Sequence, residues 1–261
     1  YLLSASFRRD GSSRFGSNSK WGNFPSVSVG WRVSDETFFN SKIINDLKLR
    51  ASYGERGNNQ IGNYSGIARL GASNYVFDDD IANGLAPRNS SNAGLTWEKN
   101  SEFNYGIDLS LFDNKLVLNA DYFISTTKDL LFRIPVPGYA GAPGGTSLQN
   151  IGEIENKGFE LGITSNITAG DLKITTNANI SSVKNKILSF GLNGEPIILN
   201  GSRAETYIAQ VGQPIGSFYG YNVKGVFTSQ QQLDNNAQWA AGGSFLGDFM
   251  YEDVNNDGVI N

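Results

Sequence analysis

The fold is decided by the stretch FNYGIDLSLFDNKLVLNADYFIS, which runs from Phe103 to Ser125. Apolar side chains take alternate positions on both sides of Asp113-Asn114, at Tyr105, Ile107, Leu109, Leu111, Leu116, Leu118, Ala120, Tyr122 and Ile124. The intervening strand positions are polar or small, apart from Val117 and Phe123. Alternation with period two predicts an antiparallel hairpin with one apolar and one polar face. Such a face fits either a β-sandwich or a membrane barrel, and the choice between them decides the function.

The composition excludes several classes of enzyme. The 261 residues include no cysteine and no histidine, so thiolate chemistry, cysteine-ligated metals and the usual general base are absent. The net charge of −4 gives no indication of a nucleic-acid-binding surface. No apolar run is long enough for a transmembrane helix. The sequence begins within one alternating pattern and ends within a motif, so we expect a segment of a longer protein.

Further segments alternate in the same way, so that seven strands are expected. They are residues 1–9, 24–33, 47–53, 159–164 and 172–180, in addition to the two strands of the hairpin. A weaker pattern near 64–70 or 75–77 would supply an eighth strand, and Ser34 is expected to cap a helical turn within 34–46. We therefore expect barrel strands and their loops in residues 1–186. A long extracellular loop or insertion is expected in residues 187–261.

The connections between these segments alternate between shorter and longer after the first strand. In an up-and-down meander this places all short turns at one end of the sheet, as in outer-membrane barrels. Charged side chains occupy the polar set of alternate strand positions, at Arg32, Lys48, Arg50, Asp108, Asp121, Glu160 and Lys173. Aromatic residues near the strand ends fit interface belts, at Trp21, Trp31, Trp97, Tyr105 and Tyr122. The sequence thus predicts an all-β, antiparallel, up-and-down transmembrane β-barrel with long extracellular loops.

The seven or eight strands predicted here form only part of a larger barrel. Unpaired sheet edges cannot face lipid, so the remaining strands are expected from the rest of the protein. Two alternatives remain open at this stage. A soluble β-sandwich that binds carbohydrate would share the alternation, and a glycoside hydrolase would use a carboxylate pair such as Asp108 and Asp121. The second alternative is weaker, because these carboxylates alternate with many other polar residues, and we predict no catalytic residues.

Several strings together closely resemble the C-terminal barrel region of the SusC/RagA family of TonB-linked outer-membrane proteins. They are RDGSSRFG (9–16), KWGNFPS (20–26), GWR (30–32), LKLRASYG (47–54) and GQPIGSFYGY (212–221). The resemblance covers nearly the whole chain. It implies a 22-stranded barrel with an N-terminal plug in the outer membrane of a Gram-negative cell. It also implies import of glycans or peptides, a SusD-like surface lipoprotein as a lid, and energy supplied through TonB. Nothing in the sequence names the nutrient or its contact residues.

The end of the chain carries a candidate cation site. The string DVNNDGVIN, residues 253–261, matches the first nine positions of an EF-hand-like loop. Ligands to Ca²⁺ would be the side-chain oxygens of Asp253, Asn255 and Asp257 and the carbonyl of Val259, with Gly258 at the sharp turn. The alternative is an exposed turn rich in Asp and Asn.

Three other segments are candidate binding sites. Asp78-Asp79-Asp80 is expected to be a solvated loop tip rather than a cation site. The aromatic ring of Tyr139 would stack on sugars if its Pro- and Gly-rich loop contacts the cargo, although a mobile lid without sugar contact is slightly favoured. The string from Pro214 to Tyr221 is expected to be an ordered surface for the lipoprotein.

Overall fold

The computed structural model describes residues 1–135, 146–191, 194–200, 206–239 and 242–260. These residues form two compact units, which are described separately. The first comprises Tyr1–Pro196 and Ala209–Ile215, and the second comprises Ile197–Ile208 and Gly216–Asn261. No helix among the described residues is long and apolar enough to span a membrane.

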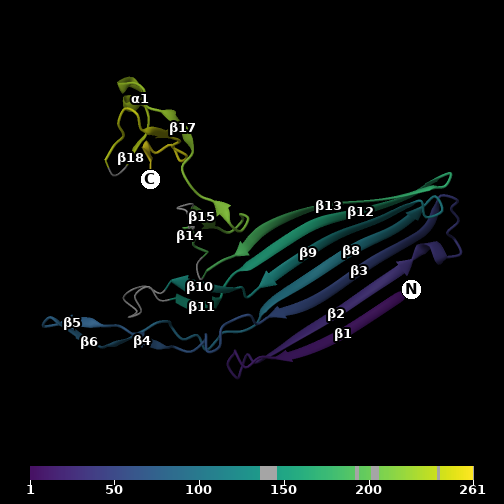
Figure 1. The fold of residues 1–261 in the computed structure, drawn as a ribbon, viewed down its shortest axis with the longest axis horizontal. Helices are drawn as coiled ribbons and strands as arrows, with labels where there is room; N and C mark the ends of the chain where they lie inside the picture. The colour runs from purple at the N-terminus through teal and green to yellow at the C-terminus, as the bar shows by residue number, and fades with distance from the viewer. Residues whose placement is uncertain (136–145, 192–193, 201–205, 240–241, 261) are drawn as a thin grey trace. The chain divides into compact units, whose positions relative to one another are not determined.

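A sheet of seven antiparallel strands dominates the first unit (Figure 1). Its strands, in spatial order, are β1 (Leu2–Gly11), β2 (Trp21–Arg32), β3 (Ile44–Asn58), β8 (Glu98–Leu111), β9 (Leu116–Lys128), β12 (Glu153–Ala169) and β13 (Leu172–Ser189). Each strand pairs with the one before it in the sheet, so the sheet is an up-and-down meander. The predicted hairpin is its centre, formed by β8 and β9.

The weaker segments do not add an eighth strand to this sheet. They form separate hairpins within the long connection between β3 and β8. One pairs β4 (Leu70–Ala72) with β7 (Leu85–Pro87), and the other pairs β5 (Tyr75–Phe77) with β6 (Asp80–Ala82). A further hairpin pairs β10 (Leu131–Pro135) with β11 (Thr146–Asn150) in the connection between β9 and β12.

The strand register carries the alternation across the sheet. One row runs through Leu49, Ile107, Ala120, Leu161 and Ile180, which lie opposite one another on five successive strands. The apolar face is open, since Leu49, Ile107 and Ile180 expose 37%, 46% and 64% of their surface. A β-sandwich would bury this face under a second sheet. No second sheet covers it in the described part of the chain, which removes the sandwich alternative.

The two tightest turns lie at one end of the sheet and the two longest connections at the other, as the sequence predicts, whereas residues 12–20 and 33–43 are of similar length. Residues 33–43, 112–115 and 170–171 join strands at one end of the sheet, and residues 12–20, 59–97 and 129–152 join them at the other. The tightest turns use left-handed backbone: φ is +54° to +62° from Phe112 to Asn114, and +61° at Gly170. The predicted cap at Ser34 is wrong. The short 3₁₀ helix η1 (Val33–Asp35) starts after Arg32, and the Ser34 hydroxyl instead donates to Asp46.

A small hydrophobic core lies among the long connections. It is made of Phe15, Phe24, Ile61, Leu95, Trp97 and Leu148, with Leu131 packed against it. Trp97 is only 4% exposed, so its assignment to an interface belt is wrong: loop residues that are distant in sequence enclose it. Trp21 is 54% exposed, and the guanidinium of Arg9 lies 5.1 Å from its ring.

The second unit is built from short strands and one short helix. It contains β14 (Ile197–Asn200), β15 (Thr206–Ala209), β16 (Ser217–Phe218), β17 (Val223–Val226), α1 (Gln230–Asn235), β18 (Gln238–Trp239), β19 (Phe249–Tyr251) and β20 (Val259–Ile260). The hydroxyl of Ser229 caps α1 by accepting from the Gln232 amide. Three rings hold the unit together, because Tyr221, Trp239 and Tyr251 pack with centroids 4.8–5.3 Å apart.

Candidate functional site

An arginine bridge lies at the centre of the polar face. Arg50 on β3 donates to both oxygens of Asp108 on β8, at 2.9 Å each. It also donates to both oxygens of Asp121 on β9, at 3.0 and 3.1 Å. The planar guanidinium presents its donors as a fork, so one side chain can satisfy two carboxylates on two successive strands. The bridge therefore links three neighbouring strands on one face.

A glycine makes this bridge possible. Gly106 on β8 lies opposite Arg50 on one side and Asp121 on the other. A Cβ atom at position 106 would lie 2.5 Å from Cζ of Arg50, so the guanidinium lies directly over the glycine backbone. The same device recurs one row away, where the ring of Phe123 covers Gly158. This accounts for Phe123 as an exception to the apolar alternation: it packs on the polar face over a residue without a side chain.

The bridge leaves no free acid–base pair. Asp108 also accepts from Asn119 at 2.9 Å, and Nζ of Lys48 lies 3.8 Å from it. Two carboxylates are thus matched by two basic side chains. A glycoside hydrolase needs one carboxyl as a proton donor and another as nucleophile or base. Because Asp108 and Asp121 share one arginine instead, the hydrolase alternative has no support from this geometry.

A row of hydroxyl groups extends the polar face beside the bridge. Ser4, Ser28 and Ser52 lie opposite one another on β1, β2 and β3, and Asn104 on β8 continues the row. A shallow hollow of about 310 Å³ lies along these strands, and Ser26 also lines it. Substrate contacts cannot be predicted from the sequence, because alternation identifies the face on which a residue lies but not its neighbour across the sheet.

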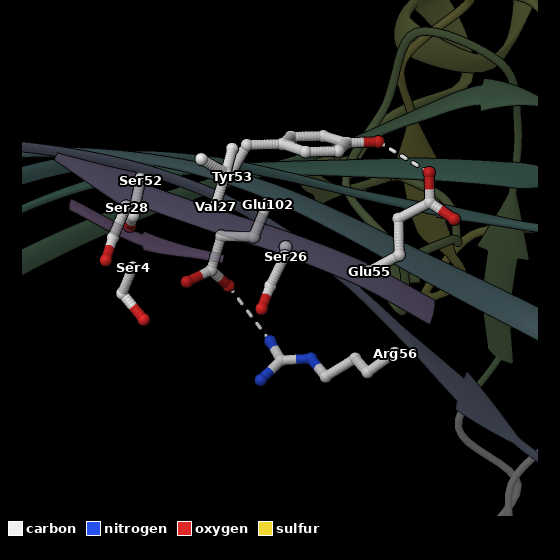
Figure 2. Close-up of a pocket in the computed structure, with 10 residues that line it drawn as sticks. Ser4, Ser26, Val27, Ser28, Ser52, Tyr53, Glu55, Arg56 and Glu102 are labelled. Atoms are coloured by element: carbon white, nitrogen blue, oxygen red, sulfur yellow. Dashed lines mark hydrogen bonds and ion pairs between the residues drawn. The ribbon is translucent and has the colours of Figure 1, made fainter. Parts of the chain in front are cut away.

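Figure 2 shows how this hollow is bounded. On the serine side of the sheet, Arg56 donates to Glu102 at 2.9 Å, so this pair of charges is also matched. On the opposite side, the hydroxyl of Tyr53 donates to Glu55 at 2.6 Å. The polar face therefore offers hydroxyl and amide groups between charges that are already paired.

The candidate calcium loop forms a compact turn. Oδ2 of Asp253 accepts from the Gly258 amide at 2.7 Å, and Gly258 has a φ of +85°. Oδ1 of Asn255 and Oδ1 of Asp257 accept from amides two residues ahead. Oδ1 of Asp253 is buried and has no hydrogen-bond partner among the described residues. A buried carboxylate oxygen of this kind is suited to act as a ligand to a cation.

Other features of the loop favour a simple turn. The Asn255 side-chain amide donates to Oδ2 of Asp257, which occupies a second candidate ligand. No cluster of three or more His, Cys, Asp or Glu side chains suited to a metal occurs in the described part of the chain. The structure thus fits Ca²⁺ at one oxygen and leaves the site a hypothesis.

The structure describes two of the three other candidate segments. Asp78 and Asp79 occupy the tight turn between β5 and β6 with positive φ, which agrees with a loop tip. Tyr139 lies outside the described residues. Within the string from Pro214 to Tyr221, the Ile215 amide donates to Asn185, and the ring of Phe218 packs on Tyr207.

Together, the open apolar face, the polar face with paired charges and the sorted connections define an outer-membrane β-barrel protein. Comparison with known proteins identifies the family. Residues 1–259 match the family described as TonB dependent receptor-like, beta-barrel, and the chain belongs to it. This family consists of transport proteins rather than enzymes.

The relatives are of the SusC/RagA type. The chain is 37% identical to TonB-dependent receptor P3 of Formosa agariphila, over 100% of this chain and 26% of the relative. It is 29% identical to TonB-dependent receptor SusC of Bacteroides thetaiotaomicron, with the same coverage. It also superposes on a structure of the RagAB peptide transporter with a TM-score of 0.77 and 28% identity, covering 96% of this chain and 28% of that chain. The chain thus spans about a quarter of the length of these relatives.

Proposed function

We propose that this chain forms part of the barrel of a TonB-dependent importer of polar oligomers, with oligosaccharides as the favoured cargo. The observation that carries the proposal is the polar wall formed by the serine row and the arginine bridge. In an outer-membrane barrel the polar face lines the lumen. Cargo passing through the lumen would meet hydroxyl groups beside charges that are already matched.

This chemistry favours neutral, hydroxyl-rich cargo. Hydroxyl groups both donate and accept hydrogen bonds, as sugar hydroxyls do. A strongly charged cargo would need counter-charges free to pair with it, whereas Arg50 and Arg56 are both engaged with carboxylates. Passage also requires contacts that are weak and repeated rather than tight. Peptides are the alternative cargo, because the RagAB relative is described as a peptide transporter.

The proposed mechanism is binding followed by gated passage, with no covalent step. A SusD-like lipoprotein would act as a lid over the long loops, and TonB would supply energy through a plug domain. The resemblance to SusC and to the RagAB complex supports both partners. The nutrient that passes would be set by the whole protein, and this chain spans about a quarter of the length of its relatives.

Growth assays test the proposed cargo. A strain lacking the full-length gene would be complemented with wild type or with the lumen variant Ser28→Leu/Ser52→Leu. The matched control is the lipid-face variant Val29→Leu/Ala51→Leu, one residue away on each strand. We expect wild type and control to grow on oligosaccharide mixtures and the lumen variant to grow more slowly. Growth that depends on the gene only with peptides as the nutrient would contradict the choice of oligosaccharides.

We also propose that the loop beginning at Asp253 binds Ca²⁺ and stiffens an extracellular segment. The buried Oδ1 of Asp253, which has no hydrogen-bond partner among the residues that the structure describes, supports this. Calorimetry of the full-length protein with Ca²⁺ should give binding heat that Asp253→Ala removes. The matched control is Asp234→Ala in α1, which should leave the heat unchanged. Absence of binding heat in the wild type would end the calcium proposal.

A further inference from the structure

A group of lysines lies on the same face of the sheet as the apolar residues, at the end that carries the long connections. This lysine patch consists of Lys99 on β8, Lys128 on β9, Lys157 on β12, and Lys184 and Lys186 on β13. The register confirms that the lysines share one face. Lys99 lies opposite Lys128, and Lys157 lies opposite Lys184. All five side chains are exposed.

The opposite face at the same level is different in kind. There the side-chain amide of Asn100 donates to Ser125 and Thr127, and Asn185 donates to Asn156. On this lumen side Arg56 also donates to Asn100 and pairs with Glu102, so its charge is matched. The lysine patch is therefore confined to the side of the sheet that faces the membrane.

The patch begins where the apolar surface ends. Tyr105, Tyr122 and Phe159 form an aromatic row across β8, β9 and β12. The next row outward contains Phe103, Ile124, Lys157 and Lys184. Two residues span about 7 Å along a strand, which is about 5 Å of depth at a tilt of about 40°. Since aromatic girdles mark the membrane interface, the lysines begin at the level of the lipid headgroups.

The charge on this patch is only partly neutralised. Lys128 pairs with Glu153 at 3.4 Å, and Lys157 pairs with Glu155 at 3.0 Å. No ion pair engages the other three lysines in the described part of the chain. Glu55 on β3 lies on the same face, opposite Ser101, and accepts from the hydroxyl of Tyr53. Five lysines against three glutamates leave an excess of positive charge.

We propose that the lysine patch binds the phosphate groups of phosphorylated lipid headgroups in the outer leaflet of the membrane. Clusters of basic residues beside an apolar surface attract anionic headgroups, while the acyl chains cover the apolar rows below. The occupant is a lipid rather than free phosphate, because the patch is continuous with the lipid-facing surface. The inference depends on the barrel family and is independent of the imported cargo.

Native mass spectrometry of the full-length protein in detergent tests this proposal. The probes are lipid A carrying both phosphates and the same lipid A after phosphate removal. Each basic residue at a membrane surface contributes roughly fivefold to binding, so three of them should account for about a hundredfold. We expect the variant Lys157→Gln/Lys184→Gln/Lys186→Gln to lose the preference for the phosphorylated lipid.

Two further variants make the result specific. The same three positions changed to arginine should keep the preference. The matched control changes Lys42, Lys115 and Lys173 to Gln, which removes equal charge at the short-turn end of the sheet. Equal binding of both lipids by the wild type would overturn the proposal, as would loss of the preference in the control. Competition by millimolar inorganic phosphate that equals competition by lipid A would also overturn it.

Discussion

Replacing Leu118 by arginine places a charge in the middle of the face assigned to lipid. Leu118 on β9 lies between Leu109 on β8 and Ile163 on β12 in one apolar row. It is four residues from Tyr122 in the aromatic row. Four residues span about 13 Å along the strand, which is about 10 Å of depth at a tilt of about 40°. The apolar band of such barrels is about 25 Å tall, so Leu118 lies close to its midplane.

The expected cost follows from this depth. An arginine at the midplane destabilises a membrane barrel by about 2–4 kcal/mol, whereas near the interface the cost is about 0–1 kcal/mol. Leu118→Arg should therefore lower the free energy of unfolding of the full-length barrel by about 2–4 kcal/mol. Asn119→Arg, one residue further on, points into the lumen beside Asp108 and should be tolerated.

Denaturant unfolding of the full-length protein in lipid vesicles measures both variants. Tyr122→Arg supplies a depth control, since the same charge is introduced at the aromatic row. The expected order of destabilisation is Leu118→Arg first, then Tyr122→Arg, then Asn119→Arg. Equal destabilisation by Leu118→Arg and Asn119→Arg would refute the assigned facing of the sheet.

Three further predictions concern polar contacts. Arg50→Gln strips Asp121 of its donors and should cost about 1–3 kcal/mol in the same unfolding assay; no change would show that the bridge adds nothing. Gly106→Ala should be destabilising in wild type and much less so with Arg50→Gln present, because its Cβ would displace the guanidinium; equal effects in both backgrounds would contradict this. The Asn222 side chain, with Lys224, lowers the pKa of Glu252 below 4.5. The Glu252 carboxylate should therefore stabilise the second unit fully above pH 4.5, and this contribution should decline as the pH falls through the lowered pKa. Hydrogen exchange in β17 and β19 that does not respond to Glu252→Gln would contradict this prediction.

Lipid enforces alternation only where it covers one face of the sheet. The sequence therefore predicted the membrane part of each strand but not its ends. The hairpin was expected over residues 103–125, yet its strands run from Glu98 to Lys128. Asn100, Ser101 and Thr126 pair in the ladder without alternating, since both faces of the sheet are wet beyond the apolar band. Likewise, β13 continues to Ser189, beyond the last regular alternation. The presence of these strands could therefore be predicted from the sequence, whereas their lengths could not.

The polar site could be predicted only in part. Parity placed Arg50, Asp108 and Asp121 on one face, which the structure confirms. Their mutual bridge depends on the register between strands and on Gly106, and neither follows from periodicity alone. The prediction that Trp97 lies in an interface belt was wrong for a different reason. For an aromatic residue near a strand end, the local sequence does not distinguish a position at the membrane interface from one in a core formed by loops.

In an outer-membrane barrel, acyl chains contact the apolar face of the sheet, and spin labelling tests this contact most directly. The chain contains no cysteine, so single cysteines can be introduced from Leu116 to Ile124 in the full-length barrel and labelled with a nitroxide. Even-numbered positions such as Leu118 and Ala120 should be accessible to oxygen dissolved in lipid. Odd-numbered positions such as Asn119 should be accessible to a water-soluble nickel reagent. Water accessibility at the even positions, or no alternation between the two reagents, would contradict the barrel assignment.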